Sequence, residues 1–333
     1  METHILLPVS KPFYTTYHHQ ANAGIAAGGN PTLRNWYLNE CMLLRCGRRF
    51  LRGYTSPEVS LWNCTCDAIP QIIKSTTSTR FLTKRYQPLI KEILRQGWYI
   101  EFTSVDDYYV KGKSWYHERH FSHDGLLCGY DDTDKTYYIA AYDKNWVYRV
   151  FQTPQSCFAR GMSAMFAKGL YSDLNALKAD PNAVVELNLA RIKENIREYL
   201  SYDFKDYPPD DDGYAYGILV QDYIGMYLER IMNGLVPYEQ VDRRIFRMLW
   251  EQKNCMLERI RTVETALGHM PDISGRFETV LSESSLLHML FARYLIKRSD
   301  RLIPVIADRL RQATLLERTL LEDFLQKLEK EGV

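Results

Sequence analysis

The feature that most constrains the fold is a pair of apolar runs separated by a short polar turn. Residues 124–131 read DGLLCGYD and residues 136–143 read TYYIAAYD, with DTDK between them. Because turn-forming aspartates separate two short apolar runs, the segment predicts an antiparallel β-hairpin. Runs rich in aromatic and β-branched residues at 98–110 and 146–151 predict neighbouring strands. Together these segments favour an antiparallel sheet.

Helical periodicity surrounds the predicted sheet on both sides. Before it, three short segments between residues 15 and 97 place apolar side chains at helical spacing and stop at glycine or proline. After about residue 163, nearly every segment has the helical period. The chain has 333 residues, enough for two domains of about 150 residues each. We therefore predict an α+β domain with an antiparallel sheet over residues 1–158 and an all-helical domain over residues 159–333.

Charge and composition exclude several classes of protein. The formal net charge is +1 and the basic residues are scattered, which argues against a nucleic-acid partner. No stretch is long and apolar enough to span a membrane, and residues 1–16 lack the pattern of a signal peptide. Seven cysteines at irregular spacing favour a reducing compartment over a disulfide scaffold. We therefore expect a cytoplasmic protein.

Two polar side chains flank the predicted hairpin. His123 lies just before the first apolar run, and Asp143 ends the second. Neighbouring strands lie about 4.8 Å apart, so the two side chains can form a hydrogen bond if the register places them opposite each other. A carboxylate beside an imidazole fixes its tautomer and stabilises the imidazolium, which is the arrangement of a general base. The alternative is a structural pair at two strand ends that face water.

The residues SHDGLLCGYDD at 122–132 and YYIAAYD at 137–143 resemble the His-strand-turn-strand-Asp segment of papain-fold cysteine peptidases. The resemblance is stronger to double-glycine leader peptidases and to acyltransferases of the butirosin biosynthesis protein H type. It implies a papain-like N-terminal domain in which His123 and Asp143 are catalytic. It also implies acyl or peptidyl transfer, with formation or cleavage of an amide, in specialised-metabolite biosynthesis.

The nucleophile is the point at which the chain departs from this family. There the order is Cys, His, Asp, and the Cys opens an early helix whose dipole lowers the thiol pKa. The early helix here, YHHQANAGIAAGG at 17–29, has no cysteine, and the nearest cysteine downstream is Cys41, inside the second predicted helix. Either Cys41 is the nucleophile, or it is a small buried side chain and the nucleophile is absent. The residues expected to bind substrate are His18, His19, Gln20, Asn22 and Tyr130.

A chain without a nucleophile leaves two functions open. His123 can activate the amine of the substrate itself, or the protein can be a catalytically inactive binding protein for a peptide or carrier protein. The resemblance implies an acyl or peptidyl carrier protein, or a peptide, as the partner, and a homodimer is left open.

No metal or nucleotide cofactor is predicted. His117, His120 and His123 lie close together, but the stretch leads into a strand and no fourth ligand is evident. The chain has no phosphate-binding loop of the G-x-x-x-x-G-K-S/T type. A thioester already stores the free energy that amide formation uses, so acyl transfer would need neither group.

Overall fold

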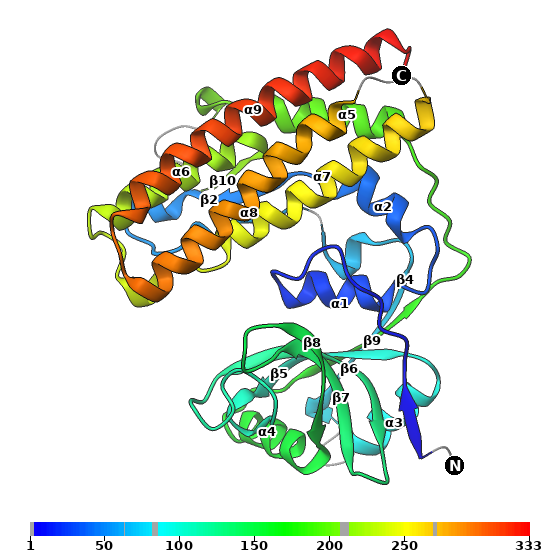
Figure 1. The fold of residues 1–333 in the computed structure, drawn as a ribbon. Coiled ribbons are helices and arrows are strands. Elements are labelled where there is room, and N and C mark those ends of the chain that lie inside the picture. The colour runs from blue at the N-terminus through cyan, green and yellow to red at the C-terminus, as the bar shows by residue number, and fades with distance from the viewer. Residues whose placement is uncertain (1–2, 63, 82–85, 207–212, 269–271) are drawn as a thin grey trace. The chain divides into compact units, whose positions relative to one another are not determined.

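The structure, a computed structural model, combines helices with an antiparallel sheet and a helical C-terminal region (Figure 1). The predicted combination of an antiparallel sheet with helices after it is therefore confirmed. No helix in the part of the chain that the structure describes has the length and apolar character needed to cross a membrane. The described residues are 3–62, 64–81, 86–206, 213–268 and 272–333.

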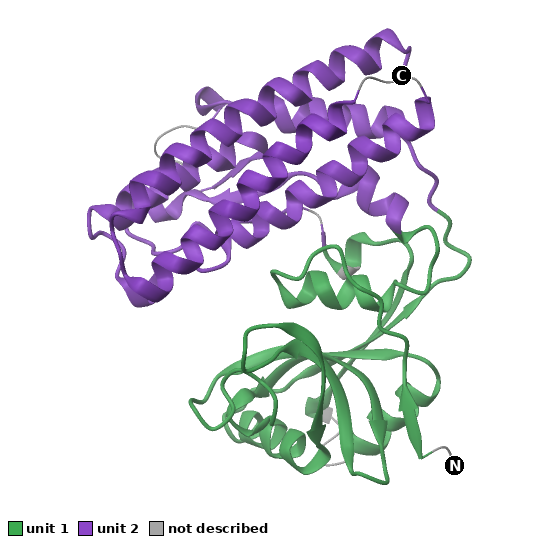
Figure 2. Ribbon diagram, in the orientation of Figure 1, with its two compact units in different colours: residues 1–33, 65–184 green, residues 34–64, 185–333 purple. Residues whose placement is uncertain are grey.

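The chain divides into two compact units, each built from two stretches of sequence (Figure 2). Unit 1 comprises residues 1–33 and 65–184, and unit 2 comprises residues 34–64 and 185–333. This division differs from the predicted boundary at residue 158, which falls inside helix α4 of unit 1.

The reason for the difference is strand pairing between distant segments. Strand β9 (Asp173–Ala179) pairs with β4 and β5 and so keeps the chain in unit 1 beyond α4. Strand β2 (Leu44–Gly47) pairs with β10 (Tyr214–Tyr216), which places an early segment in unit 2. Local periodicity does not report such non-local pairs.

Unit 1 is built around an antiparallel sheet with the strand order β4-β9-β5-β6-β7-β8. The short strand β1 also belongs to this sheet and pairs with β6. The predicted hairpin is present as β6 and β7, in register at Leu126 and Ala140. Besides β9, the strands and α-helices described in unit 1 are β1 (His4–Leu6), β4 (Ile72–Ser78), β5 (Tyr99–Asp106), β6 (Ser122–Asp131), β7 (Thr136–Tyr142), β8 (Tyr148–Pro154), α1 (His18–Ala26), α3 (Tyr86–Arg95) and α4 (Gln155–Ala167).

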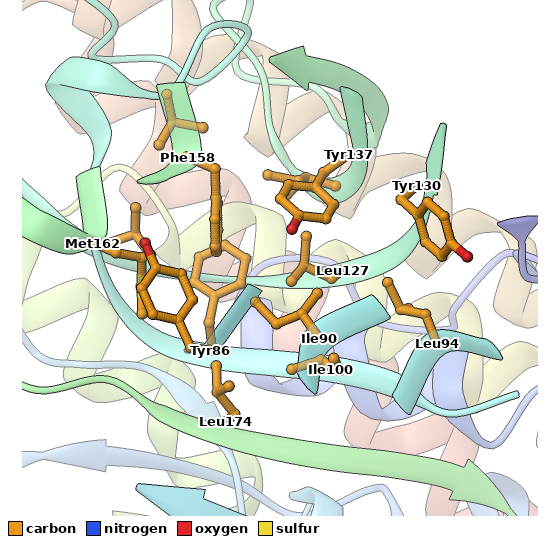
Figure 3. Packing of buried hydrophobic residues seen from close by; sticks show 14 of the residues in the cluster. Tyr86, Ile90, Leu94, Ile100, Leu127, Tyr130, Tyr137, Phe158, Met162 and Leu174 are labelled. Carbon is orange, nitrogen blue, oxygen red and sulfur yellow. The ribbon is translucent and has the colours of Figure 1, made fainter. Parts of the chain in front are cut away.

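The two faces of this sheet have different chemistry. Helices α3 and α4 cover one face, where side chains such as Ile90, Ile100 and Phe158 form an apolar core (Figure 3). Helix α1 lies on the other face (Figure 1). Because side chains alternate along a strand, Glu101 of β5 points away from the apolar core that receives Ile100 and Phe102. Polar groups are therefore buried between the sheet and α1.

Gly129 permits the close approach of β1 to β6. A Cβ at this position would lie 2.1 Å from the backbone oxygen of Ile5. We expect Gly129→Ala to lower the free energy of unfolding by about 1–3 kcal/mol, because backbone atoms must shift to admit the methyl group. Gly225, where an added Cβ meets nothing within 4 Å, is the control. Gly225→Ala in a helix should be neutral or stabilising by up to about 1 kcal/mol in urea unfolding.

Unit 2 contains long amphipathic helices with a small antiparallel sheet of order β10-β2-β3. A buried ion pair joins two of the helices: Lys253 Nζ lies 2.8 Å from Glu317 Oε1, and both side chains are almost fully buried. The described elements are α2 (Leu33–Glu40), β3 (Ser60–Leu61), α5 (Leu189–Ser201), α6 (Val220–Met232), α7 (Ile245–Leu267), α8 (Ile273–Lys297) and α9 (Leu302–Lys330).

Candidate active site

His18, the first residue of α1, is buried against the sheet of unit 1. Its Nδ1 lies 2.6 Å from Asp124 Oδ1, and its Nε2 accepts a hydrogen bond of 3.3 Å from the backbone N–H of Tyr142. A carboxylate only accepts and a backbone N–H only donates, so the neutral ring carries its proton on Nδ1. Both nitrogens of His18 are thus engaged, and the ring is held in one tautomer.

Burial and charge act in opposite directions on this pair. Burial lowers the pKa of His18, and the hydrogen bond to Asp124 only partly offsets it. Burial alone would raise the pKa of Asp124, but the hydrogen bond with His18 and the positive charge of Lys113 hold it well below its ordinary value. The pair is therefore a neutral imidazole that donates to a carboxylate anion.

His123 forms the second imidazole–carboxylate pair. Its Nδ1 lies 3.2 Å from Oδ2 of Asp107, a residue of the short 3-10 turn Asp107–Tyr109 after β5. Its Nε2 lies 3.7 Å from Asp124 Oδ1, and its ring centre is 4.4 Å from that of His18. Nδ1 faces the nearer of the two carboxylates and lies within hydrogen-bond distance of it, so the neutral ring carries its proton on Nδ1 and leaves Nε2 without one. The side chain of His123 is 28% exposed, so the ring is partly open to solvent.

A β-bulge in β5 lies opposite Asp124 of β6. In a regular strand, His123 and Asp124 would point to opposite faces. The pairing of β5 with β6 shifts between Phe102 and Val105, so one extra residue of β5 stands opposite Asp124. The N–H groups of Thr103 and Ser104 donate to Ser172 Oγ at 3.1 and 3.2 Å. Bulges of this kind are over-represented beside functional sites.

A buried lysine holds the site together. Lys113 Nζ lies 3.0 Å from Asp107 Oδ1 and donates a 2.5 Å hydrogen bond to the backbone oxygen of Asp124. The side chains of Lys113 and Asp107 are fully buried. A buried carboxylate is costly unless it is paired and hydrogen-bonded. Lys113 on one oxygen and His123 on the other meet this requirement, so Asp107 has a fixed position.

A second polar group fixes α1 one turn beyond His18. Asn22 Nδ2 donates to Glu101 Oε1 at 3.0 Å, and Asn175 Nδ2 donates to Glu101 Oε2 at 3.1 Å. The Tyr148 hydroxyl donates to Asn22 Oδ1 at 2.8 Å. Burial raises the pKa of Glu101, and the two amide donors oppose it. These bonds anchor α1 to β5, β8 and β9, and so position His18.

Asp143 is not the partner of His123, which corrects the predicted His123–Asp143 pair. Asp143 Oδ2 lies 2.5 Å from Arg149 Nε, and its Oδ1 accepts hydrogen bonds from the N–H groups of Asn145 and Val147. Its carboxylate therefore stabilises the turn between β7 and β8. The carboxylate beside His123 comes from Asp107 instead.

Cys41 does not have the environment of a nucleophile. Helix α2 ends at Glu40, so Cys41 follows the helix and is not inside it as predicted. Its thiol is buried in unit 2, 3.0 Å from Cys64 Sγ, and burial raises its pKa well above the ordinary value. A reactive cysteine needs a lowered pKa and access to substrate. Cys41 is therefore not retained as a catalytic residue.

The predicted substrate-binding residues separate into two groups. His18 and Asn22 lie in the polar layer between α1 and the sheet. Gln20 lies two residues from His18, which in a helix places it about 200° round the axis, on the opposite side of α1. His19 is half-buried beside Tyr17. Tyr130 is part of the apolar core (Figure 3), and its hydroxyl accepts from Arg95 Nε at 3.0 Å.

Sequence reasoning missed Asp107, Lys113 and Asp124. Asp124 directly follows His123, but strict strand alternation assigns it to the other face. Asp107 lies inside the run at 98–110 that was predicted as a strand, so the turn that carries it was not expected. Lys113 had no visible signal, because the sequence does not show that its ammonium group is buried.

His18, His123 and Asp124 offer ligand atoms that all lie within 4.8 Å of one another. A metal bound at Nδ1 of His18 would require that nitrogen to be unprotonated, with the proton on Nε2. Nε2, however, faces the N–H of Tyr142 and must accept. The ammonium group of Lys113 adds positive charge beside Asp124. The geometry therefore fits proton transfer better than metal binding.

The other histidines of the HERHFSH segment have separate partners. His120 Nδ1 lies 2.8 Å from Asp106 Oδ2, and His117 stacks on Tyr116 at a ring separation of 4.0 Å. The segment therefore does not bring its three histidines to one ligand.

We expect the buried His18 to make stability fall as the pH drops below about 6.5. Burial lowers the pKa of His18 in the folded chain, so the unfolded chain takes up a proton that the folded chain does not. This contribution is complete above the unfolded pKa and is lost towards the lowered folded pKa, at up to about 1.4 kcal/mol per pH unit. Urea unfolding between about pH 7.5 and 5.5 should show a shallower slope for His18→Gln. Equal slopes would contradict the buried neutral ring.

Comparison with known proteins assigns no family to the chain: no family model matches it, and no curated protein matches it.

Proposed function

We propose that the chain is an acyl- or peptidyl-transfer enzyme in which His123 is the general base. The observation that supports this most directly is the contact of His123 Nδ1 with Asp107, which leaves Nε2 unprotonated. The imidazole is accessible, while the carboxylate that orients it is buried and neutralised by Lys113. This combination is what a general base requires: a free nitrogen, a fixed tautomer and a rigid support.

In the proposed reaction His123 transfers one proton from the attacking amine to the leaving thiolate. An amine of the acyl acceptor attacks the carbonyl carbon of a thioester, and Nε2 takes the proton that the amine loses. The carbon–sulfur bond breaks, and the imidazolium returns the proton to the leaving thiolate. The products are an amide and a thiol. Asp107 and Asp124, whose Oδ1 is 3.7 Å from Nε2, stabilise the imidazolium between the two steps.

Direct transfer, without an acyl-enzyme, fits the surroundings of His123 best. Among the described residues its hydrogen-bond, ion-pair and ring contacts are two carboxylates and the rings of His18 and Phe121, and none of these is a cysteine or serine. Cys128, on the same strand, is buried, and burial raises its pKa to about 12. The nucleophile in this proposal is therefore the acceptor amine itself, or water in hydrolysis.

The proposed acyl donor is a peptide or a thioester on an acyl or peptidyl carrier protein, in specialised-metabolite biosynthesis. This part of the proposal rests on the resemblance of residues 122–143 to papain-fold peptidases and acyltransferases, not on the geometry of the site.

The second candidate is a binding protein for a peptide or carrier protein. One observation favours it: α1 begins at His18, where the resembled family carries its cysteine, and both ring nitrogens of His18 are engaged. A site closed in this way binds without forming a covalent intermediate.

The test uses octanoyl-N-acetylcysteamine as the acyl donor and glycine ethyl ester as the amine, with the amide measured by mass spectrometry. We expect wild type and Cys41→Ser to form the amide and His123→Gln to lose this activity. The intact mass of the protein should show no acylation during turnover. Activity that requires Cys41, with an acylated protein, would replace direct transfer by a covalent route. No turnover by wild type, together with binding of a carrier protein, would favour the second candidate.

A further inference from the structure

We propose that the rim beside His123 selects acyl donors that carry a carboxylate at the end remote from the reacting carbonyl, and that Arg119 binds this carboxylate. The inference rests on the proposed acyl transfer and adds the class of substrate.

A row of three side chains begins at the general base: His123 contacts Phe121, and Phe121 contacts Arg119. They are alternate residues of the chain as it enters β6. The ring of Phe121 meets that of His123 edge-on at 5.2 Å. The guanidinium carbon of Arg119 lies 5.1 Å from the centre of the Phe121 ring. An acyl chain that starts at His123 can therefore run over Phe121 to Arg119.

A second aromatic ring holds the guanidinium group. The guanidinium carbon of Arg119 lies 4.4 Å from the ring centre of Trp115. The backbone N–H of Arg119 donates to the backbone oxygen of Trp115 at 3.4 Å. Trp115 in turn packs edge-on against Trp146 at 5.4 Å. Contacts through the faces of the rings leave the N–H edges of the guanidinium group for a ligand. Because Arg119 is already placed, less side-chain entropy is lost on binding.

Arg119 lacks the carboxylate partner that its neighbours have. Lys113 pairs with Asp107, His120 with Asp106, and Arg149 with Asp143. Arg119 forms no ion pair with any residue that the structure describes. Its planar group matches a carboxylate, which can accept two parallel hydrogen bonds.

The charges around His123 place the anion at the far end of the substrate. Asp107 and Asp124 lie beside the imidazole and would repel an anion close to Nε2. The two separations of 5.1 and 5.2 Å limit the distance from the guanidinium carbon to the imidazole centre to about 10 Å. This span corresponds to about three residues of extended peptide at about 3.3 Å each, or to an acyl chain of similar length.

The experiment compares two esters of matched chain length, p-nitrophenyl octanoate and mono-p-nitrophenyl suberate, which differ by a terminal carboxylate. In each hydrolysis water attacks the carbonyl carbon and His123 takes a proton from it, the bond to p-nitrophenolate breaks, and the imidazolium releases its proton to solvent. We expect wild type to have a kcat/KM for the suberate ester roughly tenfold higher than for the octanoate ester, since a charged hydrogen bond contributes about 1.5 kcal/mol or more. Arg119→Gln should remove this preference.

The control variant is Arg298→Gln. The guanidinium carbon of Arg298 lies 4.2 Å from the ring centre of Tyr238 in unit 2, so this substitution removes the same charge and the same kind of ring contact as Arg119→Gln. It should keep the wild-type preference. His123-dependent hydrolysis of both esters without a preference for suberate, or with a preference that survives Arg119→Gln, overturns the inference and leaves the proposed function standing.

A binding measurement separates the inference from the proposed reaction. Suberate should change the tryptophan fluorescence of wild type and of His123→Gln, through Trp115, but not that of Arg119→Gln. If neither ester is hydrolysed, this titration alone tests the carboxylate site, and the thioester and amine assay tests the proposed function. Equal binding of suberate by wild type and Arg119→Gln, or no binding by wild type, would reject Arg119 as the carboxylate site.

Discussion

Replacing His123 with glutamine is expected to lower the rate of acyl transfer by a factor of about 10² to 10⁴, the usual contribution of a general base. Glutamine keeps a polar side chain of similar reach but cannot accept and return a proton. The free energy of unfolding should change little, because His123 is partly exposed and its loss leaves the Asp107–Lys113 ion pair in place. The rate is measured with the thioester and amine described above, and folding by circular dichroism.

His120 provides the matched control for this variant. It also contacts an aspartate through Nδ1, Asp106 at 2.8 Å, but it is 54% exposed and has no second carboxylate from Asp124. His120→Gln removes the same side chain from the same kind of pair three residues away. We expect it to keep the wild-type rate. A similar loss in both variants would mean that the assay reports surface histidines and not one general base.

The largest effect on stability is expected from Glu317→Gln in unit 2. The Glu317 carboxylate accepts hydrogen bonds from Lys253 at 2.8 Å, Tyr199 at 3.1 Å and Gln221 at 2.7 Å. The substitution leaves the buried Lys253 ammonium group without a counter-charge and sets an amide N–H against a donor. We expect the free energy of unfolding to fall by about 3–5 kcal/mol in urea, followed by far-ultraviolet circular dichroism.

Two further variants identify the cause of that loss. Lys253→Met with Glu317→Leu removes both charges, and this double variant should be much more stable than Glu317→Gln. Asp323→Asn breaks an exposed pair with Arg276 and should cost less than about 1 kcal/mol. If Glu317→Gln unfolds at the same urea concentration as Asp323→Asn, the buried network does not stabilise unit 2 as described.

The sequence predicted the parts of the fold that depend on local pattern. The hairpin of β6 and β7 follows from two apolar runs and one turn, and the helices after α4 follow from their period. The extent of unit 1 could not be predicted, because it depends on the pairing of β9 with β4 and β5, whose residues lie far apart in the chain.

The candidate site was predicted in part, for a similar reason. His123 and His18 could be selected by residue type and position, but the partner of His123 could not. The hairpin pattern predicted Asp143 opposite His123, but the Asp143 carboxylate instead binds Arg149 and backbone N–H groups of its own turn. Asp107 reaches His123 only because the chain turns after β5, and the β5 strand before that turn contains a bulge opposite Asp124. Turns and bulges of this kind leave no periodic signal.

The central claim is that Asp107 holds the His123 ring with its proton on Nδ1 and its Nε2 free. Long-range proton–nitrogen correlation spectra of the imidazole side chains, recorded with the rings neutral, measure this tautomer directly, with His123→Gln used to assign the signals. The account predicts a neutral His123 ring protonated at Nδ1, with the nitrogen shift of an unprotonated Nε2. A neutral ring protonated at Nε2 would contradict it, since that nitrogen could then accept no proton from a substrate.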